Sequence, residues 1–387
     1  MISIENVIVP LLVAFIATLW IHPRILEIAV MKNIVDNPDA RKLQRRPVPV
    51  IGGIAVFFGL LIGLCSSQVI TTNNIFIYVA SMCAMLYLGT IDDILNLTPR
   101  LRFAIEIIIV VLLMVVSGDS INNFHGFWGI EALPMWLAYP LTVVASVGII
   151  NAINLIDGVN GLSTGFCIMA SSLLAVHFYA TDNLPMTIIA VSAVGGIIPF
   201  FLHNVFGERT RMFIGDGGAL VMGILMSIFM MNILSSWSLS SIKSGENFGL
   251  IPFCLSILSI PVFDTLRVMS SRMLKGKSPF NADKTHLHHL FIDLGFSHVG
   301  TTFSILSINS SIVGIWFLSY LLGASIDLQL YIVVLLSILF TFIMYPFMRK
   351  QIRQRGKIFK AVNKVATTTH FEDRKFWLAL RNFIDKI

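Results

Sequence analysis

The sequence predicts an all-α, polytopic integral membrane protein with about eleven transmembrane helices, its N-terminus outside and its C-terminus in the cytoplasm. Three observations predict this fold. Of 387 residues, 56% are hydrophobic and only 12% are charged, and the mean hydropathy is +0.83. That composition excludes an ordinary soluble fold. Long apolar stretches recur along the chain, and the basic residues fall almost entirely on alternate connections.

The apolar stretches have the length of bilayer-spanning helices, about 17 to 25 residues. They lie near residues 4–29, 51–70, 74–90, 101–117, 134–151, 163–180, 184–203, 217–234, 249–267, 300–322 and 328–348.

The basic residues predict the orientation. If the spans alternate, the connections form two sets, and all 27 Lys and Arg residues except Lys243 fall in one of them. Lys and Arg are enriched in cytoplasmic loops, so this set is expected to face the cytoplasm.

The tail differs in composition from the rest of the chain. We expect a transmembrane domain over 1–348 and a basic cytoplasmic tail over 349–387. In the tail, apolar residues recur at helical spacing beside Lys and Arg residues: Phe376, Leu380, Phe383, Ile384 and Ile387. This pattern is typical of a helix lying on an anionic membrane surface.

Five acids fall at helix ends on the expected cytoplasmic face. They are Asp92 and Asp93 in "GTIDDILNLTPR", Asp157 in "NAINLIDGVNGLSTG", Asp216 in "RMFIGDGGAL" and Asp264 in "PVFDTLRVMSSR". Each alone is explained by a hydrated helix end. Because carboxylates beside hydrocarbon are costly unless they have partners, their common face favours one shared site.

The neighbouring glycines indicate what such a site binds. "DGVNG" and "GDGG" precede new helices, so backbone N–H groups there can face an anion closely. Acids and Asn beside an anion suggest a bridging divalent cation, and oxygen ligands suit Mg²⁺ or Mn²⁺. Together these features predict a site that binds phosphate groups and acts on them. Tight helix packing also explains a lone "GDGG".

Three histidines lie on the longest cytoplasmic connection, in "SPFNADKTHLHHLFIDLGFSH". A zinc site would need different spacing, and solvated loop histidines are the plain alternative. With Arg272 and the nearby lysines, His286, His288 and His289 fit a flap that grips a pyrophosphate. In the first cytoplasmic loop, Lys42 near "PVPVIGG" suits a headgroup contact.

The strings "RKLQRRPVPVIGG", "GTIDDILNLTPRLR", "NAINLIDGVNGL", "FIGDGGA" and "SPFNADKTHLHHLFIDLGFSH" resemble, in this order, the polyprenyl-phosphate N-acetylhexosamine-1-phosphate transferase superfamily, glycosyltransferase family 4. The resemblance covers about 36–298 and is closest to the bacterial N-acetylglucosamine-1-phosphate transferases. It implies Mg²⁺-dependent transfer of a sugar 1-phosphate from a UDP-sugar to undecaprenyl phosphate, releasing UMP. It also implies a bacterial inner-membrane enzyme, acting at the cytoplasmic face, that starts lipid-linked cell-envelope glycan synthesis.

Carried over by position, the resemblance assigns three kinds of site residue. The catalytic set is Asp92, Asp93 and Asp157; the metal set is Asn154 and Asp216; the substrate-binding set is Lys42, Asn204, Arg272, His286, His288 and His289. Asp92 or Asp93 could orient the lipid phosphate, accept a proton or act as a nucleophile. The sequence departs from the family at Gln44, where His is common, and at Asn160, where bacterial members often have Asp.

Two rival classes stay open from the sequence. An ion-coupled transporter also places acids in membranes, although near mid-span, and an intramembrane metalloprotease needs His ligands within a helix. The same reaction with another UDP-N-acetylhexosamine is the third alternative. The expected partners are a UDP-sugar, undecaprenyl phosphate and membrane lipid, with no nucleic acid; a homodimer is compatible with the sequence.

Overall fold

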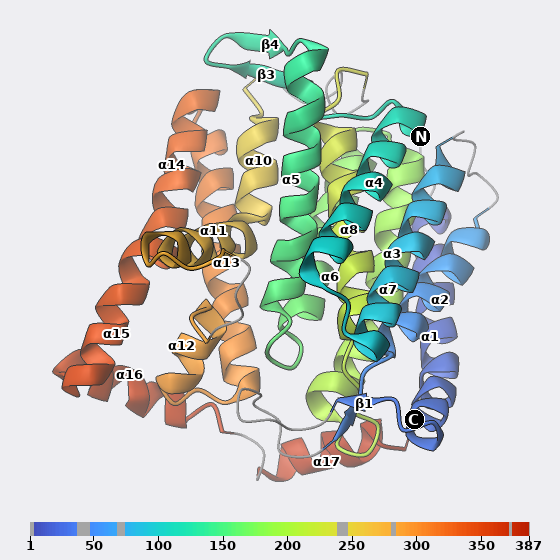
Figure 1. Ribbon diagram of the computed structural model, residues 1–387, viewed down its shortest axis with the longest axis vertical. Helices are drawn as coiled ribbons and strands as arrows, with labels where there is room; N and C mark the ends of the chain where they lie inside the picture. Colours follow the sequence, from blue (N-terminus) through green and yellow to red (C-terminus); the bar gives the residue numbers. More distant parts are fainter. Residues whose placement is uncertain are drawn as a thin grey trace.

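The computed structural model describes residues 4–36, 47–67, 74–237, 247–279, 284–370 and 374–386. Over these residues the protein is a bundle of helices with two short antiparallel strand pairs, which confirms the all-helical prediction (Figure 1). The strand pairs are β1 (Val35–Asp36) with β2 (Val48–Pro49), and β3 (Asn123–Phe127) with β4 (Ile130–Ala132).

The helices follow the apolar stretches of the sequence. The first eight are α1 (Glu5–Met31), α2 (Gly52–Cys65), α3 (Ile75–Leu95), α4 (Pro99–Ser117), α5 (Met135–Ile156), α6 (Leu162–Ala180), α7 (Leu184–Phe206) and α8 (Gly215–Ile233). The later ones are α10 (Leu250–Ile257), α11 (Ser259–Leu274), α12 (Leu287–Asp293), α13 (His298–Leu321), α14 (Ile326–Ile338), α15 (Met344–Gln354), α16 (Lys357–Thr367) and α17 (Lys375–Ile384). A π-helical turn, Leu339–Ile343, joins α14 to α15.

The centre of the bundle is α8. Of its apolar stretch, 89% is buried inside the protein, against 22% for the long helix formed by α14 and α15. Glycines allow the close packing of α8: a side chain at Gly53 would collide with Gly218, and one at Gly89 with the backbone at Asp216 and Gly217. The predicted packing role of "GDGG" is therefore real.

Eight helices are long and apolar enough to cross a membrane, or nine if α10 and α11 form one bent span. Two other predicted spans do not meet these conditions: α2 has only 14 residues, and α4 carries the charged residues Arg100, Arg102 and Glu106 in its first turns. All eleven predicted segments fall on helices, but the count of eleven crossings stays a prediction.

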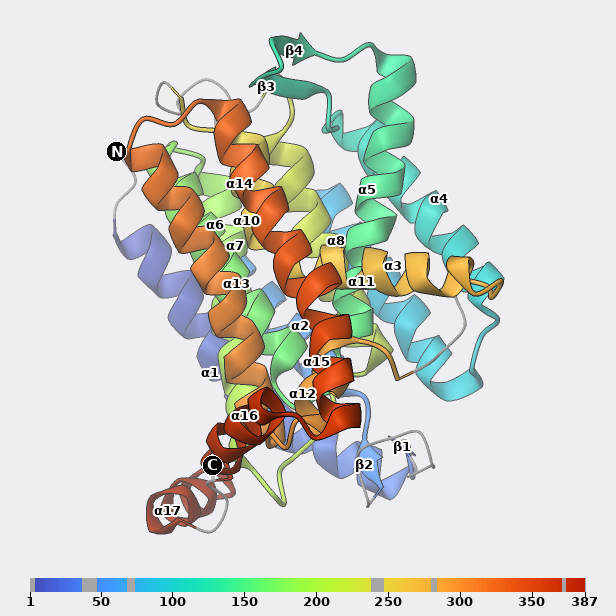
Figure 2. The same cartoon turned by 90° about the vertical axis from the view of Figure 1, so that its left-hand side faces the viewer.

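The ninth predicted segment is broken, with a bend of 72° between α10 and α11. Pro261 follows the break, and a proline cannot donate the helical hydrogen bond to the carbonyl four residues earlier. Asn309 of α13 satisfies the freed backbone groups. Its Nδ2 donates to the Ile257 carbonyl at 2.9 Å, and its Oδ1 accepts from Ile260 N at 3.0 Å. In Figures 1 and 2, α11 then runs across the bundle.

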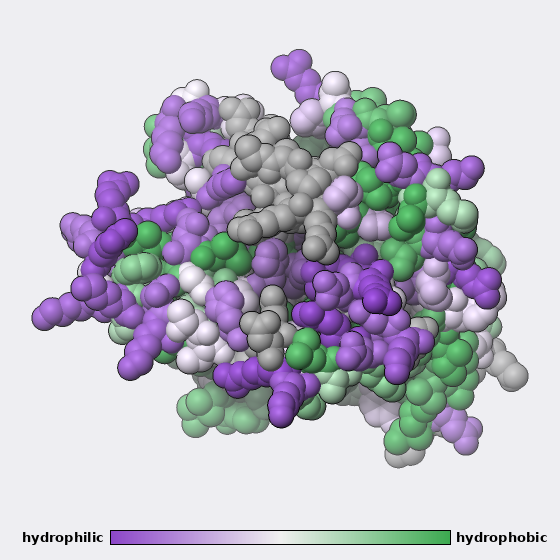
Figure 3. All heavy atoms as spheres, turned by 90° about the horizontal axis from the view of Figure 1, so that it is seen from below, coloured by the Kyte–Doolittle hydropathy of each residue, from purple (hydrophilic) through white to green (hydrophobic). Residues whose placement is uncertain are grey.

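The two ends of the bundle differ. The start of α1 and the β3–β4 hairpin lie at one end, and β1, α12, α16 and α17 lie at the other (Figures 1 and 2). The two ends of the chain thus lie at opposite ends of the bundle. Hydrophilic side chains cover much of the end that carries α16 and α17 (Figure 3). Which end faces the cytoplasm stays a prediction.

Candidate active site

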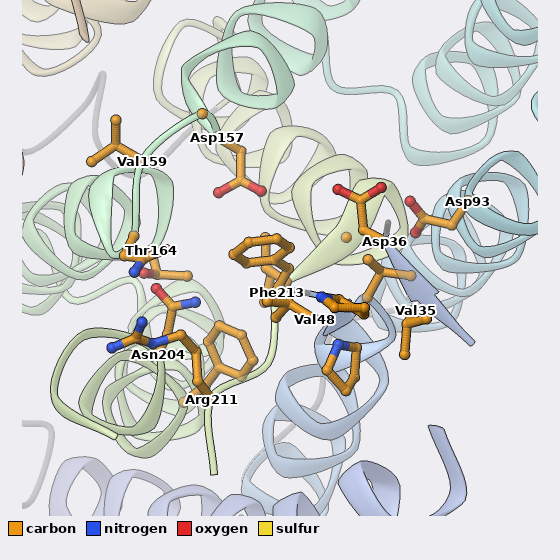
Figure 4. A pocket seen from close by; sticks show the side chains of 18 of the residues that line it. Val35, Asp36, Val48, Asp93, Asp157, Val159, Thr164, Asn204, Arg211 and Phe213 are labelled. Atoms are coloured by element: carbon orange, nitrogen blue, oxygen red, sulfur yellow. The ribbon is translucent and has the colours of Figure 1, made fainter. Parts of the chain in front are cut away.

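A cavity of about 1060 Å³ lies where α3, α5, α7 and α8 end or begin. Four of the five predicted acids line it: Asp92, Asp93, Asp157 and Asp216. Figure 4 shows Asp93 and Asp157 directed into it from opposite sides, with Asn204 and Arg211 on a third side. Asp36 of β1, which was not among the predicted site residues, also lines it. The volume exceeds what one small ligand usually fills.

The fifth acid, Asp264, does not line the cavity. It lies in α11 beyond the bend, where its carboxylate accepts from Arg267 Nη2 at 2.6 Å, from His286 Nδ1 at 3.0 Å and from Leu287 N at 3.0 Å. The expectation that all five acids share one site is wrong for Asp264, because the bend between α10 and α11 turns α11 away. Asp264 instead fixes the start of α12.

Asp93 binds the start of α8. Its carboxylate oxygens accept from the backbone N–H groups of Asp216 at 3.1 Å and Gly217 at 3.4 Å. A carboxylate at a helix N-terminus satisfies free donors and complements the helix dipole. We expected these N–H groups to face a substrate anion. Two of them face Asp93 instead.

Asp92 has different partners. Its Oδ1 accepts from Leu97 N at 2.8 Å, and its Oδ2 accepts from Arg102 Nη1 at 3.0 Å. Adjacent helical positions point about 100° apart, so the two neighbouring acids reach different groups. The two acids therefore make separate contacts and do not act as a pair.

Arg102 lies at the centre of the polar cluster, a role that the sequence motifs did not predict. Besides Asp92, its guanidinium contacts Glu106 at 3.0 Å, Asp216 at 3.4 Å and the side-chain oxygen Oδ1 of Asn154 at 2.8 Å. Only the Glu106 contact is apparent from helical spacing. The available signal was the short "NLTPR" connection between α3 and α4, which returns Arg102 to the level of Asp92.

Asn154 and Asp216, the predicted metal ligands, are in contact. Asn154 Nδ2 donates to Asp216 Oδ1 at 2.7 Å, and Gly215 precedes Asp216 with φ +70°. Over the described residues, no group of three or more His, Cys, Asp or Glu side chains is arranged as a metal site. The oxygen atoms of Asp92, Asp216 and Asn154 nonetheless converge on one guanidinium. Such hard oxygen donors are chemically suited to Mg²⁺.

Asp157 caps the end of α5 and accepts a hydrogen bond from Ser163 Oγ. Burial raises the pKa of its carboxyl to about 7, although the Ser163 hydrogen bond works in the other direction. This acid therefore titrates near neutral pH.

Of the three predicted histidines, His289 lines the cavity, whereas His286 and His288 are buried beside it. The His288 ring packs so closely on Gly158 that a side chain there would collide with it. Burial lowers the pKa of His289 to about 4 and that of His288 well below its usual value. These two rings are neutral at pH 7. As neutral groups they can still donate hydrogen bonds to a ligand.

The remaining predicted residues divide. Asn204 lines the cavity and donates to the Met212 carbonyl at 2.8 Å. Arg272 is buried, donates to the Pro279 carbonyl at 2.6 Å and does not line the cavity. Its guanidinium lies beside α11, which the bend directs away from the cavity. Lys42 and Gln44 lie outside the described residues. Asn160 lines the cavity, and its carbonyl accepts from Thr302 Oγ1 at 2.8 Å.

Comparison with known proteins identifies the family. Residues 75–234 match the model of "Glycosyl transferase family 4". The chain is 30% identical over 323 residues to the probable undecaprenyl-phosphate N-acetylglucosaminyl 1-phosphate transferase of Bacillus subtilis, covering 80% of this chain and 87% of that protein.

Two further relatives are undecaprenyl-phosphate alpha-N-acetylglucosaminyl 1-phosphate transferases. The Yersinia pestis protein is 28% identical over 280 residues, 70% of this chain and 73% of that protein. The Escherichia coli K12 protein is 26% identical over 279 residues, 70% of this chain and 72% of that protein. These matches confirm the resemblance read from the motifs: the chain belongs to glycosyl transferase family 4, a family of polyprenyl-phosphate N-acetylhexosamine-1-phosphate transferases.

Proposed function

We propose that this protein transfers N-acetylglucosamine 1-phosphate from UDP-N-acetylglucosamine to undecaprenyl phosphate, releasing UMP, at the cytoplasmic face of a bacterial inner membrane. The names of the three relatives support both substrates. The product would be the first lipid-linked intermediate of a cell-envelope glycan.

The observation that carries the proposal is the cluster of Asp92, Asn154 and Asp216 around Arg102. Asp92 and Asp216 of this cluster line the cavity. Phosphoryl transfer needs groups that position two anions and neutralise the charge between them. A guanidinium suits phosphate oxygens, and Asp216 with Asn154 would hold Mg²⁺. That ion would supply charge neutralisation on the pyrophosphate.

The reaction is a displacement at phosphorus. An oxygen of undecaprenyl phosphate forms a bond to the sugar-side phosphorus of the UDP-sugar, the bond from this phosphorus to the oxygen bridging the two phosphates breaks, and UMP leaves with that oxygen. The acceptor is already anionic near neutral pH, so no strong base is required. We assign Asp93 to holding the start of α8 in place and Asp92 to orienting Arg102.

The cavity provides for a soluble donor and a lipid acceptor. His289 and Asn204 on its wall would bind the donor through neutral hydrogen bonds. Lys42 would contact the phosphate headgroup of the lipid. His286 and His288, which are buried beside the cavity, would act indirectly by shaping this wall. Arg272 would act more remotely, by holding the chain at Pro279.

The test measures lipid-linked product in membranes containing this protein, with undecaprenyl phosphate, Mg²⁺ and a panel of UDP-sugars. We expect UDP-N-acetylglucosamine to be used best and EDTA to abolish turnover. Asp216→Asn should lose far more than tenfold, a factor worth about 1.4 kcal/mol, while inserting normally.

Other outcomes redirect the proposal. Preference for another UDP-N-acetylhexosamine would change the donor only. Turnover of Asp216→Asn within about tenfold of wild type would remove Asp216 from the metal site. Uptake of UDP-sugar into sealed vesicles without any lipid-linked product would favour a transporter.

A further inference from the structure

The loop over 207–214, between α7 and α8, forms a wall of the cavity. Arg211 and Phe213 line the cavity (Figure 4), and so does Arg209. The loop ends directly at Gly215 and Asp216, where α8 begins. Its conformation therefore decides both where Arg211 points and where α8 begins. What holds this loop in place has a direct bearing on the site.

A carboxylate from the far end of the chain binds this loop. Asp385 Oδ1 accepts from the backbone N–H groups of Glu208 at 3.0 Å, Arg209 at 3.2 Å and Thr210 at 3.2 Å, and from Thr210 Oγ1 at 2.9 Å. Successive N–H groups that converge in this way form an anion-binding nest. Partial burial raises the pKa of Asp385, yet these hydrogen bonds hold it below its usual value.

Other contacts seat α17 on the same place. The Trp377 and Phe206 rings lie 4.8 Å apart between centroids, Ile384 is buried, and Arg381 Nη1 donates to Glu208 Oε2 at 2.9 Å. An exposed ion pair alone contributes little. Together with the buried side chain and the four hydrogen bonds, it marks a specific docking of α17.

The loop is fixed from its other side by the bundle. The Thr210 carbonyl accepts from His22 Nε2 of α1 at 2.9 Å, and Thr210 Oγ1 lies 2.9 Å from His203 Nδ1 of α7. Thr210 is thus held between two membrane helices and Asp385. A change at Asp385 acts on a residue whose next neighbour, Arg211, lines the cavity.

The same tail also holds a second segment beside the cavity. Asn363 of α16 donates to the Leu294 carbonyl at 2.8 Å, and Ser297 Oγ donates to the Thr369 carbonyl at 2.8 Å. This segment, 294–299, contains His298 and Val299, both of which line the cavity. Tail residues therefore contact two of the segments that enclose the site.

We infer that the C-terminal tail is a working part of the reaction site, in which Asp385 is a positioning residue that sets the loop over 207–214 for binding of the UDP-sugar. This inference rests on the proposed function for its kinetic consequence. Glu208 and Arg209 of this loop are exposed and line the cavity. We therefore expect the water-soluble donor to reach the cavity on this side and the lipid to reach it through the bilayer. A change at Asp385 should therefore alter the binding of the UDP-sugar donor.

The kinetic test compares Asp385→Asn, Asp385→Glu and the exposed neighbour Lys386→Gln in membranes. Losing charge-assisted hydrogen bonds should lower kcat/KM for the UDP-sugar about tenfold, mainly through KM. KM for undecaprenyl phosphate should stay unchanged. Asp385→Glu keeps the carboxylate and should recover part of the loss, and Lys386→Gln should match wild type. Equal effects on both substrates, or none on either, would overturn the inference.

A second measurement does not depend on turnover. Amide hydrogen exchange reports local opening, so Asp385→Asn should speed exchange at 208–210 and also at 211–215, while α6 stays unchanged. Faster exchange confined to 208–210 would show that Asp385 holds the loop without setting the cavity wall, and would refute the positioning role. If wild type uses no UDP-sugar although exchange spreads as expected, the proposed function fails while the coupling of tail and loop stands.

Discussion

At the residue scale, Asp92 and Asp93 show how two identical neighbours acquire different roles. Asp93 satisfies the N-terminal donors of α8, and Asp92 holds the Arg102 guanidinium. The sequence could identify the pair, since adjacent acids at the end of an apolar run stand out. It could not divide their roles, because that division depends on how α4 and α8 pack against α3.

Asp157 gives a pH prediction at this scale. Its pKa rises from 3.8 to about 7 on burial, so the folded protein holds a proton that the unfolded chain releases. Stability therefore falls as pH rises from about 4 through 7. The side chain in Asp157→Asn cannot ionise but can still accept a hydrogen bond from Ser163. The difference in unfolding temperature between this variant and wild type should therefore grow in favour of the variant from about pH 4 to 7 and stay constant above that range. Thermal unfolding in detergent at several pH values measures this.

The matched control is Glu131→Gln, which removes an exposed acid from β4. Its unfolding temperature should run parallel to that of wild type at every pH. A constant difference between Asp157→Asn and wild type would contradict the burial of a carboxyl that titrates near neutrality.

At the element scale, the apolar stretches predicted where the helices lie, but not the break between α10 and α11. An average of hydropathy along the sequence does not reveal the bend, because the helices on both sides of it are apolar. The presence of Pro261 alone does not say whether a helix kinks or ends there. The decisive residue is Asn309, far away in sequence, whose amide completes the broken backbone. The same break explains why Asp264 and Arg272 lie away from the cavity.

Asn309→Ala should therefore destabilise the bend. The change leaves the Ile257 carbonyl and the Ile260 N–H buried without this partner, which costs about 2–3 kcal/mol. We expect a lower unfolding temperature in detergent and faster amide exchange over 256–262. Ser311→Ala, at an exposed position on the same helix, is the control and should leave both unchanged. An unaltered Asn309→Ala protein would show that the bend is held by packing alone.

At the scale of the whole molecule, the site is built where helix ends converge at the end of the bundle that also carries the tail. The motifs predicted most of its acids because each motif sits at a helix end, and the ends of alternate helices meet. The contribution of the tail could not be predicted, since Asp385 and Thr210 are 175 residues apart and no motif links them.

The orientation of the bundle is the last prediction. The division of basic residues places the tail inside the cell and the β3–β4 hairpin outside. In a background without the four native cysteines, Glu131→Cys should react with a membrane-impermeant maleimide in sealed right-side-out vesicles, and Lys357→Cys should react only after the membrane is opened. Both positions are exposed in the structure, so access depends on the membrane alone. Labelling of Lys357→Cys in sealed vesicles would place the tail outside, and the cavity bordered by that tail would then open away from any cytoplasmic UDP-sugar.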